Sequence, residues 1–254
     1  MTYTAIVLAG SRPGPDPFAA SFGVATKALI PIAGEPMVRR PVQALLGSDR
    51  VGEVVVLVQS PDAIAAALPT DPRLRVAKSG ETIASTILAL CDKADTRWPL
   101  LVTTADHALL DTATIDEFIR AAEDADIAIG MVERGNLLRR LPQTQRTWLK
   151  FRGGTFTGAN LFALRSAKVA PAIEQWRAVE QDRKKAWRII SLLGPLMLAG
   201  AALRLLSVDE VLSSLSDRLG LAIKAVTLSN PLAGVDVDKP EDHALAEAIL
   251  AGKA

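Results

Sequence analysis

Short aliphatic runs alternate with stretches of helical periodicity along the first half of this chain of 254 residues. The runs at 51–60, 98–106 and 126–134 have the length and the aliphatic character of buried strands. Between them, residues 81–94 and 112–125 have the apolar spacing of amphipathic helices. A repeated strand–helix–strand order is typical of a parallel sheet with helices on both faces. The sequence therefore predicts an α/β fold of three layers, α/β/α, with a Rossmann-like, mostly parallel sheet.

The composition agrees with this fold class and limits the kinds of partner. Hydrophobic residues make up 49% of the chain and aromatic residues only 4%, as expected for a parallel sheet covered by aliphatic helices. The net charge of +1 gives no reason to expect nucleic acid as a partner. Cys91 is the single cysteine, so no internal disulfide forms and we expect a cytoplasmic protein. Uninterrupted apolar runs stay shorter than the roughly 18 residues of a membrane span.

The regular alternation ends after residue 133, and a long helical pattern follows over residues 166–222. The strand–helix pattern then resumes and continues to about residue 252. We therefore predict a single domain over residues 1–254 with a helical insertion over residues 166–222.

The segment 183–206 within this helical pattern allows more than one role. Basic residues and Trp187 precede a nearly continuous apolar run over residues 192–206. A buried helix or a homodimer contact is the favoured interpretation. The alternative is peripheral contact with the inner face of an anionic membrane, which would make a lipid precursor an attractive substrate.

A strand-like run at residues 5–10 leads into a glycine-rich loop that ends at Lys27. Glycines free backbone amides for an anion, and Arg12 and Lys27 add two positive charges. A polyphosphate, and hence a nucleotide, is the ligand that such a loop fits. Its spacing matches neither the Walker P-loop nor the dinucleotide-binding fingerprint. The alternative for Lys27 is an ordinary solvated lysine.

Three carboxylates follow apolar runs at positions where strands are expected to end. Asp106 ends the run 98–106, and Asp236 and Asp238 follow the short run 232–235. In open α/β sheets ligands bind beyond the carboxyl ends of the strands, and Mg²⁺ prefers carboxylates together with substrate phosphates. The sequence therefore predicts a Mg²⁺ site. In the alternative, Asp106 caps the following turn and Asp238 caps the final helix.

A stretch without a single acidic residue, residues 134–152, carries six arginines and lysines. An anionic, phosphorylated acceptor is the substrate expected to dock there, with Lys150 on the strand that leads to a glycine turn. Thr157, Gly158 and Asn160 follow this turn and are expected to contact the acceptor. The alternatives are a solvated basic loop and a simple bend of the strand at Thr157 and Gly158.

Five of these motifs together resemble the NTP-transferase superfamily, in particular its branch similar to molybdenum-cofactor guanylyltransferase, alongside sugar-phosphate nucleotidyltransferases and cytidylyltransferases with a GT-A-like fold. The resemblance covers residues 1–165 and 225–250. The motifs that carry it are LAGS at 8–11, KALIPIAGEPM at 27–37, TTAD at 103–106, TGANLFAL at 157–164 and DVDKPED at 236–242.

The resemblance also implies roles for individual residues. It implies that Asp106 binds the metal, with Asp236 as the better match to a second ligand and Asp238 as the alternative. The sequence departs from the family pattern at Ser11, which replaces a glycine, and at His107, which we expect to be a capping or exposed histidine rather than a substrate contact. The residues implied in nucleotide binding are Leu8, Ala9, Gly10, Ser11, Arg12 and Lys27 for the triphosphate, and Ser79, Gly80, Thr82 and Ser85 for the base and ribose.

These observations predict a Mg²⁺-dependent nucleotidyltransferase. It moves an NMP from an NTP to a phosphorylated small molecule or lipid precursor and releases pyrophosphate. Arg12, Lys27 and Asp106 are the expected catalytic residues, because such a transfer depends on positioning and on charge neutralisation. CTP is the weakly preferred NTP, from the resemblance alone. The alternatives are a glycosyltransferase that uses nucleotide sugars and a nucleotide-binding protein without catalytic activity.

Overall fold

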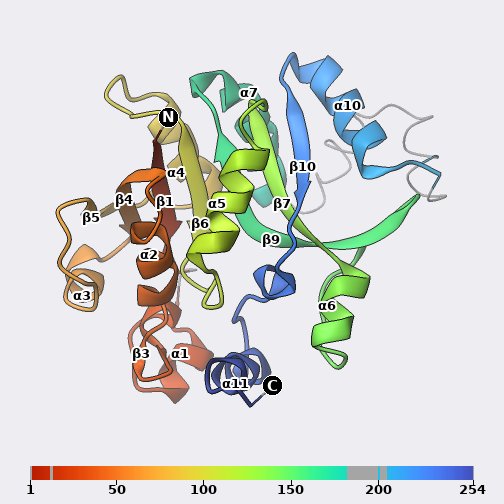
Figure 1. Ribbon diagram of the computed structural model, residues 1–254. Coiled ribbons are helices and arrows are strands. Elements are labelled where there is room, and N and C mark those ends of the chain that lie inside the picture. Colours follow the sequence, from red (N-terminus) through yellow and green to blue (C-terminus); the bar gives the residue numbers. More distant parts are fainter. Residues whose placement is uncertain (1, 12–13, 182–199, 201–204, 254) are drawn as a thin grey trace.

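The central element is an eight-stranded mixed sheet with the order β10-β7-β9-β6-β1-β4-β5, in which β8 pairs with β9 outside this path (Figure 1). The computed structural model describes residues 2–11, 14–181, 200 and 205–253. The pairs of β1 with β4 and β6, of β4 with β5 and of β7 with β10 are parallel, whereas β9 runs antiparallel to β6, β7 and β8. The strands span β1 Tyr3–Leu8, β4 Val51–Val58, β5 Leu74–Lys78, β6 Leu100–Thr104, β7 Ile127–Glu133, β8 Leu149–Phe151, β9 Gly154–Leu164 and β10 Ile223–Thr227.

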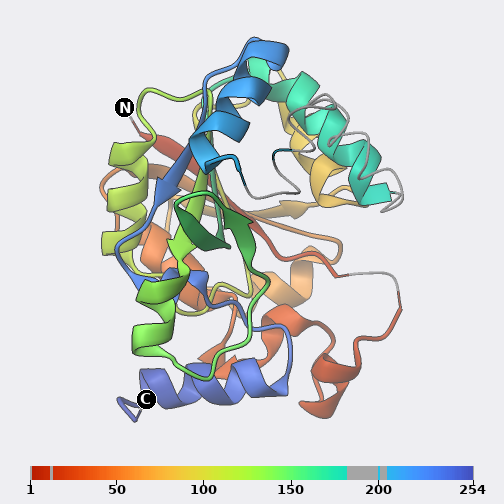
Figure 2. The ribbon, with the colours of Figure 1, turned by 90° about the vertical axis from the view of Figure 1, so that its right-hand side faces the viewer.

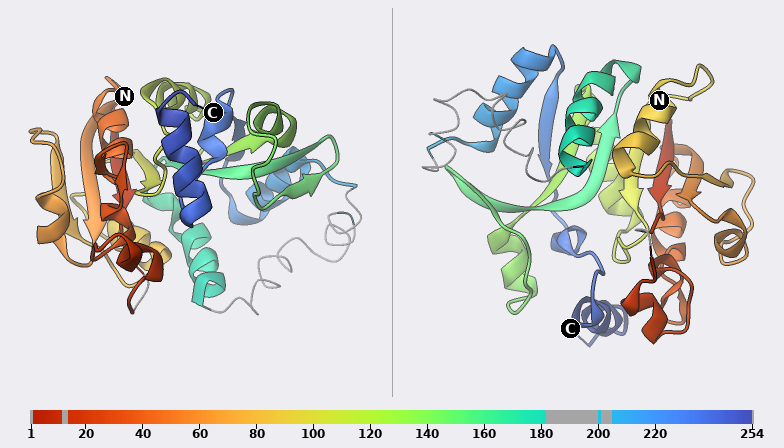
Figure 3. Two further views of the ribbon diagram at one scale, coloured as in Figure 1. Left: turned by 90° about the horizontal axis from the view of Figure 1, so that it is seen from below. Right: turned by 180° about the vertical axis from the view of Figure 1, so that it is seen from behind.

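Helices cover both faces of the sheet, which confirms the predicted fold class. Figure 2 shows α5 and α7 on opposite sides of the strands, and the right-hand view of Figure 3 shows α7 beside α4. The helices span α1 Pro17–Ser21, α2 Arg39–Leu46, α3 Pro61–Ala65, α4 Ile83–Cys91, α5 Thr112–Ala121, α6 Arg134–Arg140, α7 Ala170–Gln181, α10 Val208–Leu219 and α11 Pro240–Leu250. Shorter elements are the 3₁₀ helices η1 Lys27–Leu29, η2 Ala167–Val169 and η4 Pro231–Gly234, and the small hairpin of β2 Pro31–Ile32 with β3 Glu35–Pro36.

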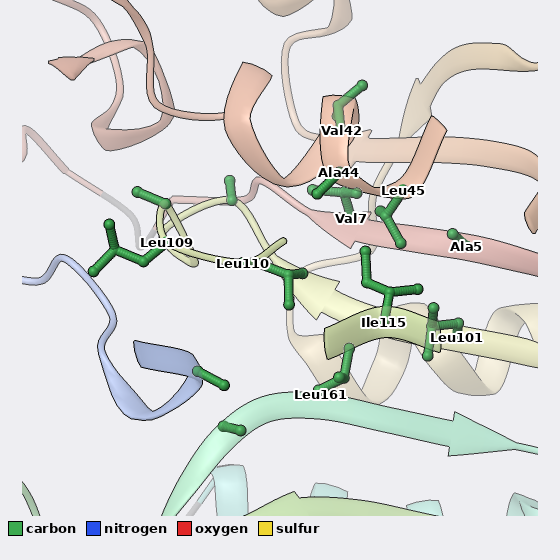
Figure 4. Close-up of a cluster of buried hydrophobic side chains, with 14 of the residues drawn as sticks. Ala5, Val7, Val42, Ala44, Leu45, Leu101, Leu109, Leu110, Ile115 and Leu161 are labelled. Carbon is green, nitrogen blue, oxygen red and sulfur yellow. The ribbon is translucent and has the colours of Figure 1, made fainter. Parts of the chain in front are cut away.

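Alternating side chains of the buried strands divide the interior into two apolar cores. In β1, Ala5 and Val7 pack with α2 and α5 in one core, whereas Ile6 packs with α4 and α7 in the other. Figure 4 shows part of the first core, with Val7 close to Leu45 of α2. Because both faces are buried, these strands read as continuous aliphatic runs rather than as polar–apolar alternation.

The structure differs from the sequence analysis at two places. Residues 134–140, the first part of the stretch for which a solvated basic loop was the alternative, form helix α6, whose first turn is capped by the Glu133 carboxylate accepting from the Asn136 amide. The short run before Asp236 is not a strand, because residues 231–234 form η4 and residues 235–238 have no regular secondary structure. Asp236 therefore reaches its position from a loop and not from the end of a strand.

Helices α7 and α10 lie at the two ends of the predicted helical insertion. Most of the segment 183–206 lies outside the described residues, so its proposed roles in a homodimer or at a membrane stay predictions. Among the described residues, no helix has the length and the apolarity needed to cross a membrane.

Candidate active site

Three distant parts of the sequence meet beyond the carboxyl ends of β1, β4 and β6. The amide of Ala105 donates to the Leu8 carbonyl, which places the turn after β6 beside the start of the opening loop. The amide of Val237 donates to the Asp106 carbonyl at 3.0 Å, which anchors the loop 235–238 at the same edge. This is the edge at which ligands bind in open α/β sheets.

Lys27 joins the opening loop to the two other segments. Its ammonium lies 2.7 Å from the Asp106 carboxylate and 2.6 Å from the Asp238 carboxylate. Burial alone would lower the pKa of Lys27, but the charges and hydrogen bonds of these two carboxylates outweigh burial and raise it to about 12. Lys27 is therefore fully charged at neutral pH, and the alternative of an ordinary solvated lysine does not hold.

Neither carboxylate that binds Lys27 acts as the helix cap considered above. Asp106 accepts from the Thr104 hydroxyl and from Lys27. The N-cap of α11 is Lys239, which makes no capping bond with its side chain, while Asp238 points to Lys27. These carboxylates are thus directed toward the site rather than toward their local backbone.

Asp236 lies next to this cluster but has different partners. One carboxylate oxygen lies 2.5 Å from Nη1 of Arg146, and the other accepts from the amide of Asn160 at 3.1 Å. Burial raises the pKa of Asp236, and the negative charges of Asp238 and Asp106 raise it further, against the opposing charge of Arg146. The three aspartates are therefore close enough to influence one another.

Arg146 is a component of the site that no single motif indicated. Its side chain is only 7% exposed and also bonds Asp242 in the first turn of α11 at 2.9 Å. Because residues 134–152 include no acidic residue, any ion pair of their arginines and lysines has to use a carboxylate from elsewhere in the chain. The sequence did not show which of them would turn inward.

A cavity of about 550 Å³ lies beside these residues, and its lining includes Asp236, Asp238 and Arg146. Three of the four residues expected to contact an acceptor, Thr157, Gly158 and Asn160, line this cavity. The fourth, Lys150, is exposed on β8 and is not part of the lining. Thr157 and Gly158 pair with Val132 and Met131 of β7, but the register of the two strands shifts between Gly158 and Phe162, so β9 is irregular next to Gly158, as the alternative of a strand bend had it.

The four residues expected near the base and ribose lie at the N-terminal end of α4 and in the segment just before it. Thr82 and Ser85 exchange a capping box, in which each side chain accepts from the other residue's amide. Gly80 packs against this capping box, because a Cβ at position 80 would lie 2.9 Å from the Ser85 hydroxyl oxygen. The Ser79 hydroxyl is buried and has no hydrogen-bond partner within the described part of the chain.

The opening loop is held by Gln59, a residue that the sequence did not indicate. Its side-chain amide accepts from the Ser11 amide and donates to the Ser11 carbonyl, both at 3.0 Å. A Cβ on Gly10 would approach Gln59 to 3.0 Å, so glycine suits this close contact. Leu8 and Ala9 continue from β1 into this loop, while Arg12 lies outside the described residues.

His107 differs from its expected exposed position. It is 1% exposed, and its Nδ1 lies 3.2 Å from the Thr103 hydroxyl. Burial lowers the pKa of His107 to about 4 despite the nearby charge of Asp106. The imidazole is therefore neutral at pH 7, and His107 is a buried residue of the core next to Asp106 in the chain.

The donor set fits a hard divalent cation, although the residues are not arranged as a closed metal site. Among the described residues, no group of three or more His, Cys, Asp or Glu side chains is arranged to hold a metal. Yet the Lys27 ammonium lies between the carboxylates of Asp106 and Asp238. A cation is thus already stabilised at this point, and carboxylate oxygens are the ligands that Mg²⁺ prefers.

Comparison with known proteins gives the family. A family model described as the MobA-like NTP transferase domain matches residues 5–203. The chain belongs to this family. It is a nucleotidyltransferase, and the resemblance seen in the sequence motifs is confirmed. A search of curated proteins gave no match.

Solved structures support the same fold for this transferase. A hypothetical transferase from Thermus thermophilus is 30% identical, covers 96% of this chain and 100% of its own, and superimposes with a TM-score of 0.78. The 4-diphosphocytidyl-2C-methyl-D-erythritol synthase of Anaerococcus prevotii is 12% identical over 98% of this chain and 96% of its own, with a TM-score of 0.62. The 2-C-methyl-D-erythritol 4-phosphate cytidylyltransferase of Thermus thermophilus is 14% identical over 99% and 100%, with a TM-score of 0.57.

Proposed function

We propose that this transferase moves the nucleoside monophosphate of an NTP onto the phosphate of a small phosphorylated acceptor. An acceptor phosphate oxygen attacks the α-phosphorus, and the bond to the bridging oxygen of the β-phosphate breaks, so that pyrophosphate leaves. The observation that carries the proposal is the contact of Lys27, from the glycine-rich loop, with Asp106 and Asp238. It supports the proposal because a lysine that can bind phosphate lies beside carboxylates suited to a metal.

On the donor side, the backbone of residues 8–11 and the Lys27 ammonium bind the triphosphate. Lys27 has a flexible stem, and one of its carboxylate partners, Asp238, is 61% exposed, so a phosphate group can compete for the ammonium. Its charge then stabilises the negative charge that develops on the leaving pyrophosphate. Arg12 has the same role in this proposal. In this proposal Ser79 and Gly80 contact the base and the ribose, and the capping box of Thr82 and Ser85 fixes the start of α4 next to them.

The carboxylates of Asp106, Asp236 and Asp238 would hold Mg²⁺. When bound, this ion supplies charge neutralisation at the α-phosphate and orients it for in-line attack. Asp106 is held from one side by the Thr104 hydroxyl, which leaves its other oxygen directed into the site. Asp236 and Asp238 approach from the facing loop, and single substitutions of each will show which of the two contributes more to metal binding.

The acceptor occupies the cavity beside Asp236. Thr157 and Asn160 offer hydrogen-bonding groups in its lining, Gly158 leaves room, and Lys150 attracts an anion from the exposed strand β8. The names of two structural neighbours specify cytidylyl transfer and an erythritol phosphate derivative. They support CTP as the first donor to test and a phosphorylated polyol as the first acceptor, with a lipid phosphate as the comparison.

Pyrophosphate release is the decisive measurement. Each of the four NTPs is combined with a panel of phosphorylated acceptors, with Mg²⁺ or with EDTA. We expect release only with Mg²⁺ and acceptor, and a loss of about a hundredfold or more in Asp106→Asn. Asp124→Asn is the matched control, because Asp124 is an exposed aspartate paired with Lys224 away from the site.

Three results would contradict the proposal. Release that needs neither Mg²⁺ nor Asp106 would refute the mechanism. Cleavage of a nucleotide sugar without pyrophosphate release would indicate a glycosyltransferase. Nucleotide binding without turnover, unchanged in Asp106→Asn, would indicate a binding protein.

A further inference from the structure

Arg146 is a buried arginine on a segment without regular secondary structure. Each of its three guanidinium nitrogens donates. Nη1 bonds the Asp236 carboxylate at 2.5 Å and the Asp236 carbonyl at 3.2 Å, Nη2 bonds Asp242 at 2.9 Å, and Nε bonds the Thr144 hydroxyl at 3.3 Å. The guanidinium therefore contacts both the side chain and the backbone of Asp236.

The contacts of Arg146 continue to the other residues of the 235–238 loop. The second oxygen of Asp242 accepts from the Asp238 amide at 3.3 Å, so the Arg146–Asp242 pair also fixes the backbone that carries Asp238. The second oxygen of Asp236 is held by Asn160, whose φ of +46° lies in the left-handed region. The Asp236 carboxylate is thus oriented from two sides.

This arrangement is better explained by orientation than by stability. Removing charges from water is costly, and a buried ion pair contributes little more to stability than apolar residues of the same size. A planar guanidinium does, however, fix the direction of each carboxylate that it binds. Its positive charge also opposes the effect that the negative charges of Asp238 and Asp106 have on Asp236.

We propose that Arg146 is a positioning residue that holds Asp236 and the Asp238 backbone in the geometry that metal binding and nucleotidyl transfer require, an inference that rests on the proposed function. Arg146 lines the acceptor cavity, but its nitrogens are already committed to Asp236, Asp242 and Thr144. It therefore acts through Asp236 and not by direct contact with substrate.

The test is Arg146→Lys, which keeps the positive charge but cannot bridge two carboxylates in a plane. The first readout is binding of Mn²⁺ to the protein without nucleotide, followed by the electron paramagnetic resonance signal of the free ion. The second is the dependence of pyrophosphate release on Mg²⁺ concentration. We expect the half-saturating concentration of either metal to rise about tenfold or more and kcat to fall, with little change in KM for the NTP.

Arg73→Lys is the matched control. Arg73 also bridges backbone carbonyls and a carboxylate, those of Leu46, Val51 and Asp71, but it lies before β5 and away from the site. We expect this variant to lower thermal stability without changing the metal dependence. Asp242→Asn, which removes one charge from the far side of Arg146, should raise the half-saturating metal concentration by a smaller factor than Arg146→Lys.

Two outcomes would overturn the proposal. One is a fall in thermal stability of Arg146→Lys with metal dependence and kcat unchanged, as in Arg73→Lys. The other is an absence of Mn²⁺ binding by the unsubstituted protein. If Arg146→Lys does not fold, Asp242→Asn decides by the same readouts. Failure of the proposed function is seen separately, as Mn²⁺ binding by the unsubstituted protein without pyrophosphate release from any NTP.

Discussion

Two clusters of one cation and two carboxylates lie on either side of the 235–239 segment, and they differ in the cation. Lys27 contacts Asp106 and Asp238 at a site where Asp238 is 61% exposed. Arg146 contacts Asp236 and Asp242 at a site where both the arginine and Asp242 are less than a tenth exposed. We call the first the open cluster, because Asp238 is exposed, and the second the closed cluster, because Arg146 and Asp242 are buried and Asp236, at 30%, is only partly exposed.

The difference shows how one combination of charges, a cation with two carboxylates, can either bind a ligand or hold side chains in place. A lysine is a compact charge on a flexible stem, so Lys27 can leave its carboxylates and bind phosphate. An arginine presents a rigid fork, so Arg146 fixes the direction of its partners. We interpret the first cluster as the part that changes during the reaction and the second as the part that does not.

The largest effect is expected from Arg146→Met, which leaves Asp236 and Asp242 without their shared cation. Loss of one partner of a buried pair should lower the free energy of unfolding by about 3–5 kcal/mol, because the remaining charges stay buried. Urea denaturation measures it. Arg152→Met, which removes an exposed arginine paired with Glu210, is the control and should change the unfolding midpoint little. Equal effects of the two variants would show that the closed cluster is not special.

The next effect is expected from Lys27→Met, which removes the open cluster's cation. Pyrophosphate release should fall by about a hundredfold, because the charge on the leaving group is no longer stabilised. Unfolding should change much less than in Arg146→Met. Lys224→Met is the control, because Lys224 forms an exposed pair with Asp124 and should not affect the rate. A rate close to that of the unsubstituted protein would contradict the role of Lys27.

Lowering the pH should reduce the free energy of unfolding through His107, the buried residue that follows Asp106 of the open cluster. Its pKa is lowered by burial to about 4, from about 6.5 in the unfolded chain, so its contribution to stability is complete above pH 6.5 and is lost as pH falls toward 4. Lowering the pH from about 7.5 to about 5 should cost about 2 kcal/mol of unfolding free energy. The contribution of the histidine is the difference between the unsubstituted protein and His107→Gln in the slope of unfolding free energy against pH. Parallel slopes would show that it does not titrate as described.

The smallest effect is expected from Gln59→Ala, which releases the opening loop but leaves both clusters intact. Losing two exposed hydrogen bonds to Ser11 should raise KM for the NTP about fivefold, equivalent to about 1 kcal/mol, with kcat nearly unchanged. Steady-state kinetics measures both constants. Gln43→Ala, an exposed glutamine on α2, is the control. A fall in kcat with unchanged KM would contradict a role in holding the loop for the nucleotide.

Much of the fold was predictable because its signals are local. The aliphatic runs at 51–58 and 100–104 are strands of a sheet buried on both faces, and the helical spacing at 112–121 is α5. Helix α6, over residues 134–140, was not predicted. There the signal for a helix was a cap, Glu133, and not an apolar face, since Leu137 is the one buried residue of α6.

The site was predictable in part. Lys27, Asp106 and Asp238 were recognised as residue types suited to phosphate and metal, and the structure brings them together. Arg146 and Gln59 were not recognised. Each acts through a partner far away in the sequence, 90 residues from Arg146 to Asp236 and 48 from Gln59 to Ser11. No local pattern reports such a pair.

The sequence by itself determined the fold class, the glycine-rich loop and the kinds of charged side chain available to the site, because periodicity and composition are properties of neighbouring residues. The tertiary structure alone decided which charges meet. Lys27 is separated from Asp106 by 79 residues and from Asp238 by 211. Their contact exists because β1 and β6 are adjacent in the sheet and the loop 235–238 is bonded to the end of β6. The same packing, by burying Arg146 and exposing Asp238, made one cluster a support and left the other open to a ligand.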